Sequence, residues 1–332
     1  MLRRWETRRG GHYEAGWHAF ERGDFTIAAR YWRPLAVAGN ASAQYGFGLA
    51  LFEGYDGQPA DHDEAAVWLR KAADKGLAVA YTALGRMYER GDPFPKDLAE
   101  AAKWYHQAAE AGEVLAQAYL GGFYDRGDGV AQSNEQAAKW YRSAAEQGDA
   151  SAQYNIGAML AHGRGGVRDE REAIDWWMKA ADQGDASAQY NLGWMHLYGR
   201  TLPRDPAKAA DLFEKAVAQG HNSAQYNLGL LYAYGVGVPR DDARAASLFR
   251  MAAEQGNPSA QSSLGMMLVE GLVPSDDTAA FMWLELAVSD FSSTEAQWRD
   301  DAISYRERVA ARMTPMQIVE ARRLARGWLP KV

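Results

Sequence analysis

Three sets of glycines recur along the chain at a spacing of 36 residues, each after a single first interval of 37. The first set is Gly48, Gly85, Gly121, Gly157, Gly193, Gly229 and Gly265; the second is Gly54, Gly91, Gly127, Gly163, Gly199, Gly235 and Gly271; the third is Gly39, Gly76, Gly112, Gly148, Gly184, Gly220 and Gly256. A period kept in three registers at once is typical of repeat proteins, in which each unit packs on its neighbours. The chain is therefore predicted to fold as an array of seven similar units rather than around one central core.

The fifth repeat shows what one unit contains. Ala188 and Leu192 lie on one helical face at i and i+4, and this spacing predicts an amphipathic first helix. Gly193 lies in the middle of that helix, where Gly costs about 1 kcal/mol relative to Ala, so we expect it to permit close approach of the partner helix. Gly199 is predicted to end the helix in the left-handed conformation. Asp205 is predicted to cap a second helix.

The second helices of other repeats begin at residues that favour the N-cap position, followed three residues later by Glu or Gln, the pattern of a capping box. These pairs are Asp61 with Glu64, Asp97 with Glu100, Ser133 with Gln136 and Asp169 with Glu172. Two further helices are predicted beyond the repeats, beginning at Ser292 and at Thr314. Five arginines are expected to give these two helices a polar outer face: Arg306, Arg308, Arg312, Arg322 and Arg323.

Together these features predict an all-α fold, a right-handed α-solenoid of seven helix-turn-helix repeats with about eighteen helices of about 10 to 18 residues and no sheet. The expected segments are a basic N-terminus with a degenerate half-repeat (1–38), seven repeats (39–76, 77–112, 113–148, 149–184, 185–220, 221–256 and 257–289) and C-terminal capping helices (290–332).

The repeats resemble the Sel-one-like repeat, a relative of the tetratricopeptide repeat (TPR) that is common in bacteria. The resemblance rests on Ala-Gln-Tyr-Asn-Leu-Gly at 188–193, on the turn Gly-Val-Gly-Val at 235–238, and on the Trp-Tyr and Ala-Ala pairs of the second helices. It covers about residues 39–289. It implies a scaffold or adaptor that binds other proteins, in bacterial signalling, envelope regulation or secretion-effector immunity. Some family members link each repeat by a disulfide, which this chain, having no Cys, cannot form.

Composition and charge argue against two classes of function, nucleic acid binding and membrane spanning. A net charge of -7 argues against nucleic acid binding, and the cluster Arg3, Arg4, Arg8 and Arg9 is interpreted as a solvated terminus. No apolar stretch approaches the roughly 20 residues of a membrane-spanning helix, and no secretory signal is evident at the start. We therefore expect a soluble cytoplasmic protein without membrane insertion; a periplasmic location is the alternative if a signal peptide has been removed.

No catalytic, metal-binding or cofactor-binding constellation is found in the sequence. None of the seven histidines has the spacing His-Glu-x-x-His, and His196 takes the place of a Tyr in other repeats, which indicates a core position. The Gly-x-Gly turns at 127–129, 163–165 and 235–237 follow no predicted strand and precede no Gly-Lys-Ser/Thr, so they are interpreted as repeat turns rather than phosphate loops. We predict a non-enzymatic protein with no cofactor.

The candidate partner-binding residues lie on the first-helix face opposite Leu192, which is expected to line the concave side. Three groups contribute: the aromatic residues Trp194, Tyr198, Tyr234, Tyr190 and Tyr226; the amides Asn155, Asn191 and Asn227; and the arginines Arg86, Arg90 and Arg126. Tyr190 and Tyr226 belong to the repeat pattern, which favours a structural role for them, and the amides are equally open to a structural role and to gripping a peptide. Trp194, Tyr198 and Tyr234 occupy variable positions, where large aromatic side chains favour binding.

The predicted partner is another protein or peptide, with an acidic segment opposite the arginines. Two alternatives stay open: Trp194 fills the gap between neighbouring first helices and serves only packing, or the chain is a structural or oligomerisation module without a groove ligand. We expect a monomer.

Overall fold

The computed structural model describes residues 2–274 and 276–331, with side chains from Gly11 onward. Over these residues the chain has eighteen α-helices, one short 3-10 helix and no strand. This confirms the predicted all-α fold, and only α1, with 20 residues, exceeds the expected helix lengths. The basic cluster Arg3, Arg4, Arg8 and Arg9 lies outside the described side chains.

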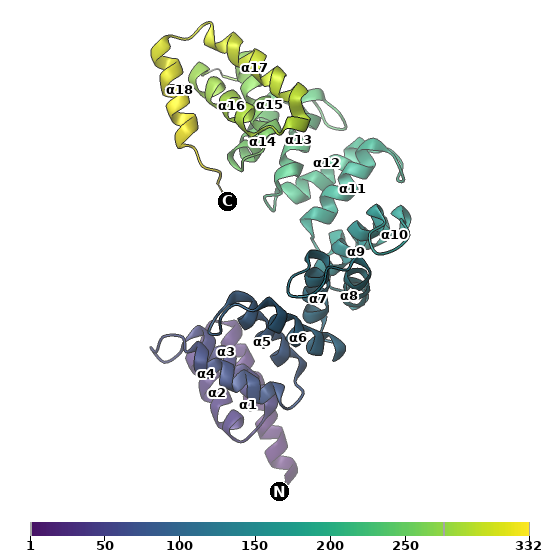
Figure 1. The fold of residues 1–332 in the computed structure, drawn as a ribbon, viewed down its shortest axis with the longest axis vertical. Helices are drawn as coiled ribbons and strands as arrows, with labels where there is room; N and C mark the ends of the chain where they lie inside the picture. Colours follow the sequence, from purple (N-terminus) through teal and green to yellow (C-terminus); the bar gives the residue numbers. More distant parts are fainter. Residues whose placement is uncertain (1, 275, 332) are drawn as a thin grey trace. The chain divides into compact units, whose positions relative to one another are not determined.

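The helices divide into two compact parts, Met1–Ala173 and Ile174–Val332, and within each part consecutive helices pack on one another as in a solenoid (Figure 1). The first part contains α1 (Leu2–Glu21), α2 (Phe25–Val37), α3 (Ala41–Glu53), α4 (His62–Ala73), α5 (Ala78–Arg90), α6 (Leu98–Glu110), α7 (Val114–Arg126), α8 (Asn134–Glu146) and α9 (Ala150–His162). The division falls inside α10 (Glu170–Asp182). The second part contains α11 (Ala186–Tyr198), α12 (Pro206–Val217), α13 (Asn222–Tyr234), α14 (Asp242–Glu254), α15 (Pro258–Val269), α16 (Asp277–Asp290), the 3-10 helix η1 (Ser293–Glu295), α17 (Ala296–Ala310) and α18 (Pro315–Gly327).

The mid-helix glycines make room for a large side chain of the second helix in the same repeat. A Cβ at Gly193 would lie 2.7 Å from the ring of Phe213 and 3.3 Å from the carbonyl oxygen of Ala209, both in α12. Gly229 has the same relation to Phe249, at 2.6 Å. The expected close approach is therefore confirmed, but the nearest group is a side chain rather than the backbone of the partner helix.

The turn glycine and the N-cap residues of this paragraph take the predicted conformations, but the predicted capping boxes form only in part. Gly199 ends α11 in the left-handed region (φ 66°, ψ 40°), and the Asp205 carboxylate caps α12 by accepting a backbone N–H at 3.0 Å. Asp61 likewise accepts the backbone N–H of Glu64 at 2.8 Å. The Glu64 carboxylate accepts the indole N–H of Trp68 at 3.1 Å. Only the N-cap half of the predicted capping box forms at Asp61, and the same holds at Asp97 and Ser133.

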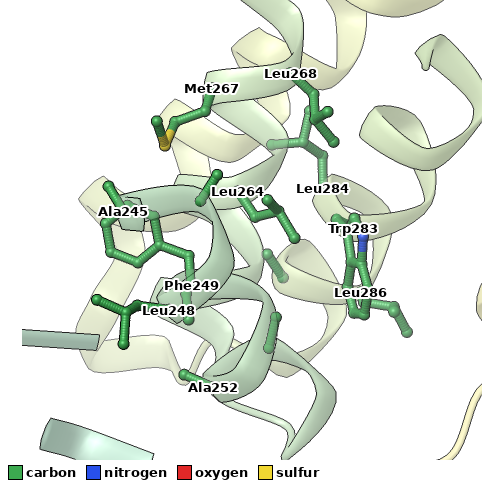
Figure 2. Close-up of a cluster of buried hydrophobic side chains, with 14 of the residues drawn as sticks. Ala245, Leu248, Phe249, Ala252, Leu264, Met267, Leu268, Trp283, Leu284 and Leu286 are labelled. Carbon is green, nitrogen blue, oxygen red and sulfur yellow. The ribbon is translucent and has the colours of Figure 1, made fainter. Parts of the chain in front are cut away.

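Buried alanines and larger apolar side chains from each helix build the core. In the second part, Phe249 of α14, Leu264 of α15 and Trp283 of α16 belong to one hydrophobic cluster (Figure 2). Ala245 and Ala252 of α14 have no exposed surface, so neighbouring helices approach closely along that face. Each repeat thus completes its core with side chains of the next, which is why single units of such arrays are not independent.

Helix pairs precede and follow the repeats. At the front, α1 and α2 pack on α3, and the Trp32 indole of α2 lies against Gly16 of α1 much as Phe213 lies against Gly193. At the back, α17 packs on α15 and α16, and α18 packs on α16.

Of the arginines predicted to give a polar outer face, Arg308 on α17 and Arg312 just after it are exposed, and Arg306 on α17 is half-buried. Three pairs join them to acids of the seventh repeat: Arg306 with Glu285 at 2.7 Å, Arg308 with Glu270 at 2.8 Å and Arg312 with Asp277 at 2.7 Å. These ion pairs connect the last helices of the chain to the seventh repeat. On α18 the outer surface includes apolar Met316 and Val319, which are 82% and 65% exposed.

Candidate protein-binding surface

Aromatic side chains of α11 and α13 gather in the second compact part, and we call Trp194, Tyr198, Tyr226 and Tyr234 the aromatic surface. Trp194 and Tyr198 lie one turn apart on α11, with ring centres separated by 4.6 Å. Burial raises the pKa of Tyr226 on α13, a hydrogen bond with Ser263 lowers it in part, and the hydroxyls of Tyr234 and Tyr198 make smaller contributions that raise it. Tyr226 and Tyr234 lie on α13, the first helix of the repeat that follows α11 and α12.

The members of this surface differ in how far they reach into solvent. Tyr198 is 56% and Tyr234 is 75% exposed. Trp194 is half-buried and packs against the hydrophobic cluster of Figure 2. The Arg200 guanidinium lies 5.3 Å from the Trp194 ring centre, within the range of a cation–π contact. Exposed tyrosines beside a cation can contact both apolar and acidic groups of a partner.

Tyr190 lies deeper than the aromatic surface. Its ring lies between Phe213 and His221, with ring centres 5.7 Å and 4.8 Å away. Burial raises the pKa of Tyr190, while the amide of Asn227, which donates to the phenolic oxygen at 3.3 Å, lowers it. Asn227 also donates to the carbonyl oxygen of Ser223 at 2.9 Å. The amide N–H groups of Asn227 are therefore used inside the protein in this structure.

The other two amides occupy the same helix position in earlier repeats. Asn191 lies on α11 and Asn155 on α9, and both are half-buried. Asn155 belongs to the first compact part and Asn191 to the second.

The three candidate arginines lie in the first compact part and are exposed. Arg126, at the end of α7, pairs with Asp128 through Nε at 2.6 Å. Arg86 and Arg90 lie on α5, and neither forms an ion pair with any residue that the structure describes. These two arginines therefore keep positive charge available, whereas that of Arg126 is partly neutralised.

Carboxylates near these arginines give the face a mixed charge. Asp125 pairs with Arg164 at 2.7 Å, and Glu89 accepts the Tyr105 hydroxyl at 2.5 Å. Burial and then the Asp125 carboxylate raise the pKa of Tyr141 to about 12, against the opposing effect of nearby arginines. Acidic groups of the chain itself thus compete with an acidic partner for the arginines on this face.

Two placements escaped sequence reasoning. Thr82, one helical turn before Arg86, is buried and donates its hydroxyl to Glu113 of the next repeat at 2.8 Å, so it is not part of the exposed face. Arg200 was missed as the partner of the Trp194 ring. Its only signal was its place directly after the helix-ending Gly199, at a position that varies between repeats.

The Gly-x-Gly turns and the histidines fill structural positions. The second glycine of the turn, Gly237, lies so close to the backbone of Pro206 that no side chain fits between them. His196 is buried, with Nδ1 3.2 Å from the carbonyl oxygen of Pro203, as its predicted core position requires. In residues 2–274 and 276–331, no group of three potential metal ligands gathers, and no helix is both long and apolar enough to span a bilayer.

Comparison with protein families gives one match along the array. The model of the Sel1 repeat matches seven consecutive segments: 41–77, 78–113, 114–149, 150–185, 186–221, 222–257 and 258–289. No curated protein matches the sequence significantly.

Solved structures include several with the same architecture. A Sel1 repeat protein from Oxalobacter formigenes is 33% identical, with a TM-score of 0.63 over 68% of this chain and 93% of its own. A protective antigen of uropathogenic Escherichia coli strains, described as having an SLR fold, is 28% identical, with a TM-score of 0.61 over 96% of this chain and 76% of its own. An immunity protein from Pseudomonas aeruginosa, 21% identical with a TM-score of 0.40 over 70% of this chain and 82% of its own, is similar in fold alone.

Proposed function

The chain belongs to the Sel1 repeat family, and from that premise we propose that it is a non-enzymatic scaffold that binds a partner protein or peptide through the aromatic surface. Sel1 repeat proteins are generally protein-interaction scaffolds. The observation that supports this site is the exposure of Tyr198 and Tyr234, together with the contact between the rings of Tyr198 and Trp194. Large aromatic side chains contribute most to binding when a partner covers them.

The proposal extends to the partner's chemistry. Arg200 at the aromatic surface, and Arg86 and Arg90 in the first compact part, favour a partner that carries acidic residues among apolar ones. Arg126 contributes less because Asp128 already pairs with it. Bacterial signalling, envelope regulation and secretion-effector immunity are the processes that we propose for such a scaffold.

The test is quantitative binding to a partner identified by affinity capture and mass spectrometry. Tyr234→Ala is the main variant, because a side chain that is 75% exposed contributes little to the fold. We expect its dissociation constant to rise by about 30-fold or more, the equivalent of about 2 kcal/mol. Trp298→Ala removes another exposed aromatic, on α17, and serves as the matched control with unchanged affinity.

Trp194→Ala separates binding from packing. Because Trp194 is half-buried, the melting temperature of the Trp194→Ala protein and its affinity for the partner must be measured together. Unchanged affinity of folded Trp194→Ala and Tyr234→Ala proteins would show that the partner binds elsewhere. A loss of folding in Trp194→Ala with full binding by Tyr234→Ala would assign the aromatic surface to packing.

A second candidate function, self-association, is favoured by the exposed Met316 and Val319 on α18. The terminal cap of a repeat array normally has a polar outer face, and exposed apolar residues there favour contact with another molecule. Sedimentation equilibrium decides between a monomer and an oligomer. If the chain self-associates, Val319→Ser should weaken the association, and a concentration-independent monomer mass would remove this candidate.

A further inference from the structure

A cavity of about 460 Å³ is lined by residues of α16, the second helix of the seventh repeat, and of α17 and α18. Both α17 and α18 pack on α16, and all three helices are labelled in Figure 1. Its apolar lining comes from Leu286, Val288 and Ala325. Leu286 belongs to the buried cluster beside Trp283 (Figure 2), so this side of the cavity is held by the core. The cavity is distinct from the aromatic surface, which lies on α11 and α13.

The charged lining of the cavity is unbalanced. Arg306 contacts Glu285 at 2.7 Å, and Arg322 approaches the other oxygen of the same carboxylate at only 3.5 Å. Arg326 donates through Nε to the carbonyl oxygen of Arg322 at 3.4 Å, and it has no carboxylate partner among the residues described. The cavity is therefore lined by three guanidinium groups and a single carboxylate, and Arg326 forms no ion pair with a residue that the structure describes.

We propose that this cavity binds the C-terminal residue of a partner protein, with its carboxylate on Arg322 and Arg326 and its apolar side chain against Leu286 and Val288. A guanidinium presents paired N–H donors that match the two oxygens of a carboxylate. The volume is within the range of about 300 to 1,000 Å³ that is typical of ligand pockets with apolar walls and a few polar groups.

The terminal residue of a chain suits this cavity better than an internal acid or a phosphate. In a C-terminal residue, the carboxylate and the side chain leave the same Cα, so one small group offers charge and apolar surface together. The cavity presents the same two features side by side, with Arg322 and Ala325 less than one helical turn apart on α18. A phosphate alone would leave the apolar lining uncovered.

The experiment compares two fluorescein-labelled pentapeptides of one sequence ending in Leu, one with a free C-terminal carboxylate and one with a C-terminal amide. Fluorescence polarisation with the full chain at low salt should show the acid binding at least about tenfold more tightly than the amide, the equivalent of about 1.4 kcal/mol. Equal affinities for the two peptides would overturn the proposal.

Variants on α18 locate the site. Arg326→Gln breaks no ion pair of the described structure, so it should fold normally and weaken binding of the acid peptide about tenfold. Arg323→Gln is the matched control, because Arg323 is the same residue type on the same helix but pairs with Glu320 at 2.6 Å and does not line the cavity. Equal loss in both variants would show a general charge effect and overturn the site.

Glu285→Gln is expected to change the affinity for the acid peptide in the opposite direction. Removing the carboxylate that competes for Arg322 should tighten binding of the acid peptide about threefold. A purely structural role for these ion pairs predicts a lower melting temperature without tighter binding, and that result counts against the proposal.

Inorganic phosphate serves as a competitor, and displacement by phosphate at concentrations below the peptide's dissociation constant would reassign the cavity to phosphate. The outcome is independent of Tyr234, so the proposed function and this site can fail separately.

Discussion

The side-chain amide of Gln255 donates to the Oε1 atom of Gln225 in the same repeat at 3.0 Å, and also to the carbonyl oxygen of Gly220 at 3.1 Å. Gln225 is buried. The same arrangement joins Gln219 to Gln189 at 3.1 Å. In these two repeats the buried amide oxygen of the first glutamine accepts a hydrogen bond from the glutamine that precedes a turn glycine, and we call this arrangement the glutamine ladder.

The ladder is broken in the first repeat. Lys75 stands where Gln255 stands in the sixth repeat, directly before a turn glycine, and its ammonium donates to the carbonyl oxygen of Gly39. The buried Oε1 of Gln44 has no hydrogen-bond partner. A buried acceptor without a partner costs about 1 to 3 kcal/mol.

Lys75→Gln should therefore stabilise the chain by about 1 kcal/mol, because the new amide can reach both Gly39 and Gln44. Urea denaturation followed by circular dichroism measures the change. Lys75→Met is the control, since it removes the charge and supplies no donor, and we expect it to be destabilising. Equal midpoints for the two variants would mean that the ladder has no energetic role.

Gly193→Ala should destabilise the chain by about 1 to 3 kcal/mol, the usual cost of overpacking a core. The added methyl group would lie 2.7 Å from the Phe213 ring, which has no exposed surface and cannot move freely. Gly166→Ala makes the same substitution where no atom lies within 4 Å of the new Cβ. A thermal midpoint of Gly193→Ala equal to that of Gly166→Ala would refute the packing argument.

The fold was predictable because the glycine positions report backbone geometry directly. Gly199 and Gly193 were assigned to a left-handed helix end and a close helix contact, and both assignments are confirmed. The ion pairs of Arg306, Arg308 and Arg312 were not predicted. Their partners, such as Glu285 for Arg306, lie on other helices, and the period of a single helix does not show which of its faces meets a carboxylate.

The candidate binding residues were less predictable than the fold. Sequence position alone put Trp194 and Tyr198 on one face, and the structure brings their rings together. It did not show that Asn227 donates to Tyr190 across two repeats, or that Thr82 is buried beneath Glu113. Such contacts depend on how neighbouring repeats stack, which a repeat pattern does not encode.

Gly220→Val should cost more than about 1 kcal/mol, because φ at Gly220 is 81° and a β-branched residue is strained in that region. Gly184, with φ of 95°, occupies the equivalent turn, and the same substitution there should have the same sign. No atom lies within 4 Å of a Cβ at either position, so backbone strain is isolated from crowding. Thermal midpoints that barely move in both variants would contradict the turn assignment.

His221 caps the start of α13 in a way that depends on pH. Its Nδ1 accepts the backbone N–H of Ala224 at 3.2 Å, which only a neutral imidazole can do. Burial lowers the pKa of His221, and the Asp185 carboxylate opposes this only in part. A protonated ring at this place would also meet the positive end of the helix dipole.

The sign of the pH dependence follows from the lowered pKa. As pH falls through about 6.5, the ordinary pKa of His, the unfolded chain takes up a proton at His221 and the native chain does not. The free energy of unfolding therefore decreases until the pH reaches the lower pKa of the native state. In His221→Asp the cap is a carboxylate, as it already is at Asp185, and this loss should disappear. We expect a difference below about 1 kcal/mol, because solvent screens a half-exposed ring. Urea midpoints of both proteins at pH 7.5 and pH 5.5 measure it. The other six histidines are common to both chains, so identical pH dependence would show that His221 keeps its cap at either pH.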